Sequence, residues 1–166
     1  MDKRASRQST TPRKTGLHLK RPCLLVADLE RSLQLYRDVL GFRLDYVSAA
    51  GADSYLYQVF QLPATAELTF AALSTEHELR ALALTEVKNI PWPPVTAPHR
   101  LGLVMQVPAV EPLIEQVRQL DLEVVEPNCF NAPPNLVFTE QGFYDFDGQL
   151  VIIYETRIEK KSSFQS

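Results

Sequence analysis

The sequence predicts an α+β fold in which a β-α-β-β-β module occurs twice in tandem. Three observations indicate it: the same order of apolar patterns in both halves, a capped amphipathic segment after a strand-like segment, and an Asp-Gly pair between two strand-like segments. An element order repeated along one chain is stronger support for a fold than any single segment. With 45% of its 166 residues hydrophobic, the chain can bury one sizeable core or two half-size units around a shared one.

The first module is predicted over residues 17–88. LHLKRPCLLVA is apolar enough for a strand, and Asp28 follows it where an N-cap satisfies the first free amides of a helix. Gly41 is placed to end that helix, and FRLDYVSA alternates as a half-buried strand does. AELTFAALS and LRALALTEV are predicted to pair as a hairpin. The apolar face of the helix comprises Leu29, Leu33, Tyr36 and Leu40, with Val39 as a further candidate.

Two segments interrupt the symmetry. Within residues 52–62, Tyr55, Val59 and Leu62 lie at helical spacing, so we expect an inserted helix there, although Tyr57 and Val59 would also suit a strand. Residues 89–98, NIPWPPVTAP, are predicted to be an extended linker, because their four prolines suit neither a helix nor a central strand.

The second module is predicted over residues 99–157. RLGLVMQVPAV is strand-like, VEPLIEQVRQL is an amphipathic helix, and LEVVEP is a short strand. PNCFNAPPN is interpreted as a loop. FTEQGFYDF and QLVIIYE are strands joined at Asp147-Gly148, a pair that accepts the unusual φ values of a tight hairpin turn. The apolar helical face comprises Val110, Leu113, Ile114, Val117 and Leu120.

Composition restricts the class of partner. Residues 1–16 are basic and poor in apolar side chains, which predicts a disordered tail without the helical spacing of a transit peptide, and residues 158–166 are expected to be flexible. A net charge of −3 argues against nucleic acid as the main partner. No apolar run approaches the roughly 20 residues of a membrane helix, and two cysteines are too few for a disulfide scaffold. We therefore expect a cytoplasmic protein with neither nucleic acid nor membrane as partner.

A resemblance to a known superfamily sharpens this interpretation. DLERSLQLYRDVLGF resembles the signature of the vicinal oxygen chelate superfamily, which includes glyoxalase I, extradiol dioxygenases and bleomycin-resistance proteins, and FYDFDGQLVIIYE resembles its closing hairpin. The likeness covers residues 18–157. It implies a curved mixed sheet around a cleft, and a homodimer in which the cleft forms within one chain or between swapped chains. It does not imply one reaction, because this fold hosts lyases, isomerases, oxygenases and pure binders.

The same resemblance implies where a metal would be held. Metal-using members take one ligand from the first and the last strand of each module, which in this sequence gives Arg21, Ala83, Gly102 and Ile152. None of these side chains can bind a divalent cation. We therefore predict no cofactor and no metal of the usual kind.

A shifted metal site is the alternative. His18 and His99 lie three residues before the implied positions, and Glu86 and Glu155 lie three residues after them. An odd offset turns a strand side chain to the opposite face, so each strand would need a bulge. The simpler interpretation is that the histidines are surface residues and the glutamates are solvated strand ends. His77 is a weaker candidate still.

Counting by twos along the strands gives the side chains expected in the cleft. Arg21 is the most informative, because a guanidinium at a vacated metal position can hold a carboxylate, phosphate or enolate oxygen. The alternative is that Arg21 pairs with a surface acid. Cys23 is expected to be a buried structural thiol, since no base is evident beside it. The predicted ligand-binding residues are Arg21, Cys23, Ala83, Thr85, Gly102, Gln106, Ile152 and Tyr154.

Three functions follow from these predictions. The first is a metal-free small-molecule binder of bleomycin-resistance type that holds an apolar or anionic compound. The second is a glyoxalase- or dioxygenase-like lyase, isomerase or oxygenase that uses either the shifted ligands or Arg21 as an electrophile. The third is a dimerisation or regulatory module. The sequence leaves open whether the protein is an enzyme.

Overall fold

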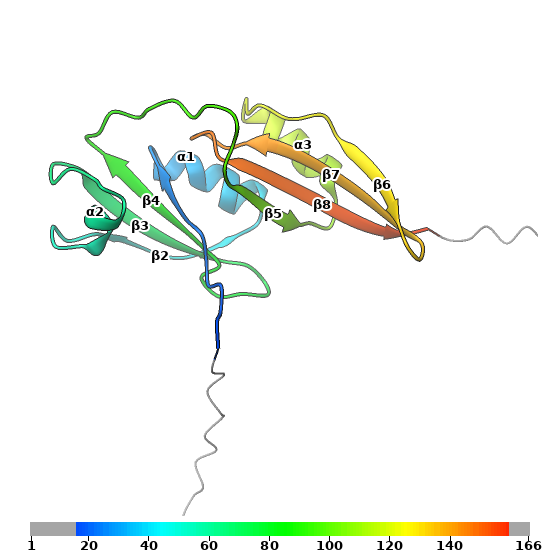
Figure 1. The fold of residues 1–166 in the computed structure, drawn as a ribbon, viewed down its shortest axis with the longest axis horizontal. Helices are drawn as coiled ribbons and strands as arrows, with labels where there is room; N and C mark the ends of the chain where they lie inside the picture. Colours follow the sequence, from blue (N-terminus) through cyan, green and yellow to red (C-terminus); the bar gives the residue numbers. More distant parts are fainter. Residues whose placement is uncertain (1–15, 160–166) are drawn as a thin grey trace, which may run out of the picture.

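Two four-stranded mixed sheets make up the body of the protein (Figure 1). The computed structural model describes residues 16–159, so the tail predicted at 1–16 and the end predicted at 158–166 lie almost wholly outside the described residues. Sheet A has the strand order β1-β4-β3-β2, and sheet B repeats it as β5-β8-β7-β6. The predicted α+β fold of two tandem β-α-β-β-β modules is therefore confirmed. The strands are β1 (Cys23–Val26), β2 (Arg43–Ala49), β3 (Glu67–Ser74), β4 (Leu82–Lys88), β5 (Gly102–Gln106), β6 (Asn128–Ala132), β7 (Leu136–Tyr144) and β8 (Leu150–Ile158).

The main helices cover one side of the two sheets, behind the strands in Figure 1. They are α1 (Leu29–Leu33), continued by the π-helix η1 (Gln34–Val39), and α3 (Val110–Gln119). The first strand of each module runs parallel to the last, and the remaining pairs are antiparallel. The principal core lies between the sheets and these helices and combines buried residues of both modules, among them Leu24, Leu33, Leu84, Ile114, Phe143 and Val151. We call the opposite side of each sheet its open face.

The first helix begins and ends where the sequence predicts, but its middle differs. Asp28 Oδ1 accepts a hydrogen bond from the Arg31 amide at 3.0 Å, and Gly41 takes a left-handed φ of +86° after the last turn. Between them the chain widens into the π-helix, in which the Leu40 amide donates to the Leu35 carbonyl at 2.9 Å. A wider turn rotates the residues around it relative to an α-helix. Leu35, absent from the predicted apolar face, is consequently buried.

The inserted segment is helical, in agreement with the prediction, although α2 spans only Tyr55–Val59. Leu56 and Tyr57 pack in a second cluster that includes the buried residues Leu68 and Val87. Leu68 and Val87 pair across β3 and β4 with their side chains on the open face of sheet A. The helix therefore covers part of that face, whereas no corresponding helix covers sheet B within residues 16–159.

Two strand assignments made from the sequence are wrong. The segment interpreted as a loop, PNCFNAPPN, contains the edge strand β6, and the short strand expected at LEVVEP is reduced to one isolated bridge between Val124 and Phe143. The prolines flank β6 without interrupting it, and the stacked rings of Phe130 and Phe138, 5.0 Å apart, align it on β7. The strand β2, expected to be half-buried, is mostly exposed because it lies at the edge of sheet A.

Across residues 16–159, no helix combines the length and the apolar composition that a membrane crossing requires.

Each module holds its helix by a glutamate from its last strand. Glu86 Oε1 accepts from the Leu29 amide at 3.0 Å, and Glu155 Oε2 accepts from the Val110 amide at 2.6 Å. Both carboxylates thus satisfy the first free amide of a helix and face its positive end. The prediction that these glutamates are solvated strand ends is wrong: Glu86 is 9% exposed and Glu155 3%. An odd step along each strand turns them to the helix side.

Two hydrogen bonds, one buried and one partly buried, join the modules. The Tyr36 hydroxyl of the first module donates to Asp145 Oδ2 at 2.7 Å, and the Ala27 amide donates to Asp147 Oδ1 at 2.9 Å. Burial, together with the charge of Asp145, holds the pKa of Tyr36 well above its usual value, so the hydroxyl keeps its proton. Asp145 Oδ1 also accepts from the amides of Asp147 and Gln149. The β7–β8 turn is therefore organised around the carboxylate that receives Tyr36.

We expect Tyr36→Phe to lower the free energy of unfolding by about 1.5–3 kcal/mol, because it deprives a buried carboxylate of its donor. Tyr57→Phe is the matched control, since the Tyr57 hydroxyl donates to the neutral Ala66 carbonyl at 2.8 Å within one module. That change should cost about 1 kcal/mol. Urea unfolding of both variants measures the difference, and equal losses would show that the bond between the modules has no special weight.

We expect Glu86→Gln and Glu155→Gln each to destabilise the fold by about 1–2 kcal/mol, since each replaces a charged acceptor at a helix N-terminus by a neutral one. The solvated acid Glu111, in the first turn of α3, provides the control through Glu111→Gln. Thermal unfolding of the three variants tests the assignment. A cost for Glu111→Gln as large as that of the two buried substitutions would contradict it.

Candidate functional site on the open faces of the sheets

The predicted site residues lie along the open faces. Cys23 is in register with Ala83 and Leu25 with Thr85 in sheet A, while Val104 is in register with Ile152 and Gln106 with Tyr154 in sheet B. The residues that alternate with them, such as Leu24, Leu84 and Ile153, belong to the core beneath the helices. A strand turns successive side chains to opposite faces. Arg21 precedes β1 in the same alternation, so all eight predicted residues share the open side.

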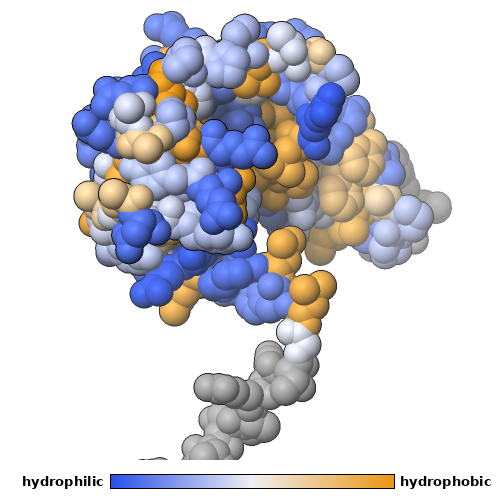
Figure 2. All heavy atoms as spheres, turned by 60° about the vertical axis from the view of Figure 1, so that its left-hand side comes forward, coloured by the Kyte–Doolittle hydropathy of each residue, from blue (hydrophilic) through white to orange (hydrophobic). Residues whose placement is uncertain are grey.

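Their exposure differs between the modules. Ala83 and Thr85 have no exposed surface, and the Cys23 sulfur lies 3.6 Å from the Thr85 hydroxyl. In sheet B, by contrast, Gly102 and Gln106 are exposed, Ile152 and Tyr154 are half-buried, and Val104 is 64% exposed. Figure 2 shows the surface hollowed between the first module, in front, and the second, with hydrophobic residues on the side of the second. Ala83 and Thr85 therefore shape the floor of sheet A, while the accessible wall belongs to sheet B.

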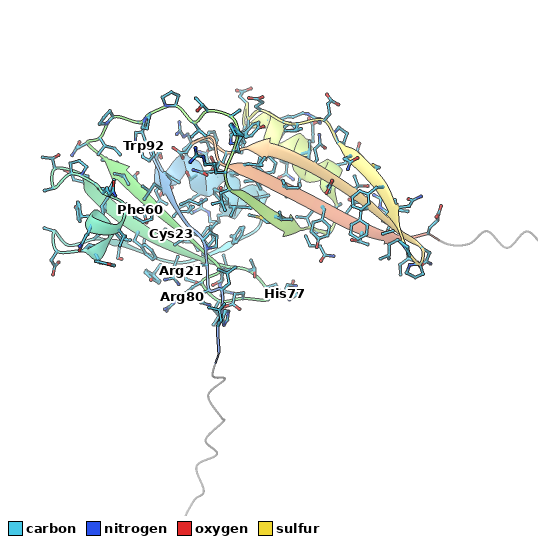
Figure 3. The ribbon with its side chains drawn as sticks, viewed as in Figure 1. Arg21, Cys23, Phe60, His77, Arg80 and Trp92 are labelled. Carbon is cyan, nitrogen blue, oxygen red and sulfur yellow. The ribbon has the colours of Figure 1, made fainter. Side chains whose placement is uncertain are left out.

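Two arginines stack on neighbouring aromatic rings of sheet A. The Arg21 guanidinium lies 5.8 Å from the centre of the Phe70 ring, and that of Arg80 lies 5.3 Å from the centre of the Tyr46 ring. The two rings are themselves 5.9 Å apart. Figure 3 shows Arg21 and Arg80 at the same end of the sheet. We call these four residues the arginine–aromatic cluster; cation–π stacking fixes each guanidinium over a ring.

Acidic residues around this cluster already have partners. Asp45 accepts from the Ser74 hydroxyl and from Arg43 at 3.2 Å, and these contacts, the Ser74 bond foremost, hold its pKa below the usual value. Glu78 pairs with Lys20. Within residues 16–159, the guanidinium groups of Arg21 and Arg80 form no ion pair and no hydrogen bond. Pairing of Arg21 with a surface acid, the alternative considered from the sequence, is not seen. Arg80 lies close enough to Asp45 for its charge to lower the pKa of that acid, but it forms no ion pair with it. The N–H donors of both guanidinium groups therefore stay available to an anion.

Arg80 is the residue that sequence reasoning missed. It lies in the turn before β4, with a left-handed φ of +54°, where counting by twos along a strand gives no orientation. Its backbone amide donates to the Ser74 hydroxyl at 2.7 Å, which anchors the turn below Tyr46. Only the three-dimensional structure shows that its guanidinium reaches the Tyr46 ring of β2.

A cavity of about 580 Å³ lies where the modules meet. The turn at Gly41, the β3–β4 loop and the end of β5 form its walls. Thr75, Glu76, His77 and Gln106 are its polar lining residues. A volume of this size accommodates a metabolite, since small-molecule sites span about 300–1,000 Å³. Of the predicted ligand-binding residues, Gln106 is the one that lines this cavity.

The residues at the four implied metal positions do not fit a divalent ion, because Arg21 is itself a cation and Ala83, Gly102 and Ile152 have no donor atom. The shifted set does not converge either. Its two glutamates bind helix amides on the other side of the sheets, His18 lies 3.8 Å from Glu78, and His99 stacks on Tyr144 at 4.7 Å. Within the described chain, no group of three or more His, Cys, Asp or Glu side chains is arranged to hold a metal.

Known structures share this architecture. A glyoxalase family protein from Bacillus cereus superimposes with a TM-score of 0.66 and 14% identity over 89% of this chain and 99% of its own. A glyoxylase/bleomycin resistance protein/dioxygenase domain from Frankia gives 0.59 and 17% over 86% of this chain and 100% of its own. A fosfomycin resistance protein from Listeria monocytogenes gives 0.54 and 14% over 85% and 94%. At these identities the likeness establishes the fold alone.

The sequence was also compared with curated proteins and with family models. No curated protein matches the sequence. A family model described as the Glyoxalase/Bleomycin resistance protein/Dioxygenase superfamily, however, matches residues 18–153, which is most of the chain. The match agrees with the resemblance found in the helix signature and the closing hairpin. The chain belongs to the Glyoxalase/Bleomycin resistance protein/Dioxygenase superfamily.

Proposed function

We propose that the protein binds a small molecule with an anionic group and an apolar body in the hollow between its two modules, and that it does so without a divalent metal. The observation that carries this proposal is the pair of guanidinium groups, Arg21 and Arg80, which stack on adjacent rings and form no ion pair within residues 16–159. Arginine presents a rigid fork of N–H donors that matches carboxylate and phosphate oxygens.

The position of Arg21 supports this choice of ligand. It stands where the superfamily resemblance implies a metal ligand, and a guanidinium supplies at that place the positive charge that an oxygen of the bound molecule would otherwise find in a cation. Stacking on Phe70 and Tyr46 restricts both arginine side chains before a ligand arrives. Less conformational freedom is then lost on binding.

The apolar body is assigned to sheet B. Val104 and Ile152 form an aliphatic surface in register with each other, and Tyr154 packs near the ring of Phe138 at 6.1 Å. These side chains are accessible, unlike their counterparts in sheet A. Gln106 and the Tyr154 hydroxyl add hydrogen-bonding groups along the same face. An apolar wall with a few polar groups is typical of small-molecule sites.

The fluorescent hydrophobic anion 8-anilinonaphthalene-1-sulfonate is a direct probe of this site. We expect Arg21→Gln and Arg80→Gln each to weaken its binding about three- to tenfold, in keeping with partly exposed ion pairs. Arg118→Gln, on the outer face of α3, is the matched control and should leave binding unchanged. Fluorescence titration at constant ionic strength gives the dissociation constants.

Two results would contradict the proposal. Equal binding by Arg21→Gln, Arg80→Gln and the Arg118→Gln control would remove the role of the arginine–aromatic cluster. One tightly held divalent ion per chain, found by elemental analysis of protein purified without a histidine tag, would restore a metal-dependent function. Mass spectrometry of compounds that co-purify from a metabolite extract then identifies the natural ligand.

A homodimer also stays a prediction. Exposed apolar side chains on the open face of sheet B, Val104 and Phe130, and on the extended segment before β1, Leu17 and Leu19, are available to a second copy. Sedimentation velocity over a range of concentrations should give a species of twice 18.8 kDa. A species of 18.8 kDa at every concentration would show that one chain forms the site alone.

A further inference from the structure

We propose that the outer edge of strand β6 is an interface between two copies of this chain, in which a second β6 pairs with the first in antiparallel orientation. The two copies of the four-stranded sheet B then form one continuous sheet across a twofold axis. This edge belongs to the second module, whereas the arginine–aromatic cluster belongs to the first. The interface is therefore independent of the proposed function.

Strands β2 and β6 are the outer edges of the two sheets (Figure 1). The other two edge strands, β1 and β5, lie toward the middle of the molecule, where the modules meet. Within residues 16–159, β2 pairs only with β3, and β6 pairs only with β7. One row of backbone N–H and C=O groups on each outer strand is therefore open to an added strand.

Strand β2 has features that protect an edge against pairing. Its register on β3 shifts between Leu44 and Tyr46, as it does at a bulge. The strand is also charged, and Arg43 Nε donates to Asp45 Oδ1 at 3.2 Å. Bulges and charged side chains both discourage the addition of another strand. The outer edge of sheet A is thus poorly suited to a partner.

Strand β6 occupies the equivalent place in sheet B and has none of these features. Its five residues, Asn128–Ala132, include no charged side chain and no proline, and their register on β7 is uninterrupted. Four of the five are exposed. Proteins rarely leave an uncharged and regular edge without a partner, because it is a template for another strand. The contrast between the two outer edges selects β6 as the docking edge.

A row of aromatic rings makes this edge complementary to a second copy of itself. The rings of Phe130 and Phe138 are stacked, with their centres 5.0 Å and their planes 2° apart, and the ring of Phe138 lies 6.1 Å from that of Tyr154. The stacking distance matches the spacing of neighbouring strands, which is about 4.8 Å. Phe130 is the outer end of the row and is 43% exposed. A further β6 extends the row by one ring at the same spacing.

Twofold symmetry determines the register of two identical strands. Antiparallel pairing over all five residues of β6 places Phe130 opposite the partner's Phe130, and Cys129 opposite Asn131 of the partner subunit. Aromatic pairs directly opposite each other stabilise a sheet. Like charges do not meet in this register, since the strand carries none. The edge is short, so the interface is small and the dimer should dissociate on dilution.

Sedimentation velocity of the full chain over a range of concentrations tests the interface. We expect a reversible equilibrium between a species of 18.8 kDa and one of twice that mass. Phe130→Lys places two like charges opposite each other at the twofold axis, so the dissociation constant should rise by about tenfold. Val47→Lys, at a position on the β2 edge that is 45% exposed, is the matched control and should leave the constant unchanged.

Three results would overturn this interface: a native protein that stays monomeric at every concentration, an unchanged constant for Phe130→Lys, or equal weakening by Val47→Lys. Arg21→Gln, which tests the anion site, should not alter the dimer. Failure of the interface is thereby distinguished from failure of the proposed function. Should Phe130→Lys fail to fold, the register test below decides in its place.

A cysteine at position 131 tests the register and leaves Phe130 intact. Residues directly opposite in an antiparallel pair have Cα atoms about 4.5–5.5 Å apart, which suits a disulfide. Cys129 and Asn131 are both exposed, so Asn131→Cys should cross-link to the partner's Cys129 in a glutathione redox buffer. The native protein and Asn131→Ser, in which Cys129 faces no thiol, should stay uncross-linked on a non-reducing gel. Equal cross-linking of all three proteins, or none by Asn131→Cys, would overturn the proposal.

Discussion

The relative placement of the two modules depends on the buried bond between the Tyr36 hydroxyl and the Asp145 carboxylate. Asp145 is almost fully buried, and its other carboxylate oxygen accepts hydrogen bonds from two amides of the β7–β8 turn. One side chain therefore connects this turn to the first helix. The neighbouring bond from the Ala27 amide to Asp147 adds a second point of attachment at the end of β1. Two attachment points oppose rotation of one sheet about the other. The hollow and the cavity at the module junction both lie between the modules that these bonds hold together.

Within each module, the two faces of the last strand have different roles. Glu86 and Glu155 turn inward and bind a helix amide, while the residues three positions earlier, Ala83 and Ile152, turn to the open face. The two glutamates are needed for each helix to begin at a fixed place on the sheet, because an unsatisfied amide at a buried helix end is costly. Side chains on the open face do not have to bind a helix amide. Residues on this face can therefore differ, with Arg21 before β1 and Gly102 at the start of β5, without loss of the scaffold that positions them.

The sequence predicts the scaffold well because the scaffold rests on local signals. Asp28, Gly41 and the Asp147-Gly148 turn mark boundaries through backbone chemistry that a few neighbouring residues decide, and the order of elements follows. The misassigned segments depend on distant partners. The strand β6 is aligned on β7 by the contact of Phe130 with Phe138. Leu35 is buried by a π-helical turn, which the spacing of apolar residues does not predict. Arg80 joins the candidate site only because its turn before β4 lies beside Tyr46 of β2. Alternation along a strand gives no orientation for a turn residue, so it predicted Arg21 and missed Arg80.

The open faces have diverged although the modules share one topology. In sheet A, α2 and the arginine–aromatic cluster occupy the face, and the strand residues beneath them, Ala83 and Thr85, are small and buried. In sheet B, with no inserted helix in the described chain, the aliphatic side chains of Val104 and Ile152 meet solvent. Charge is thus concentrated on one wall of the hollow and apolar surface on the other. A ligand of the proposed kind, with an anionic and an apolar end, would be held in one orientation there, since turning it round would bury the anionic end against hydrocarbon.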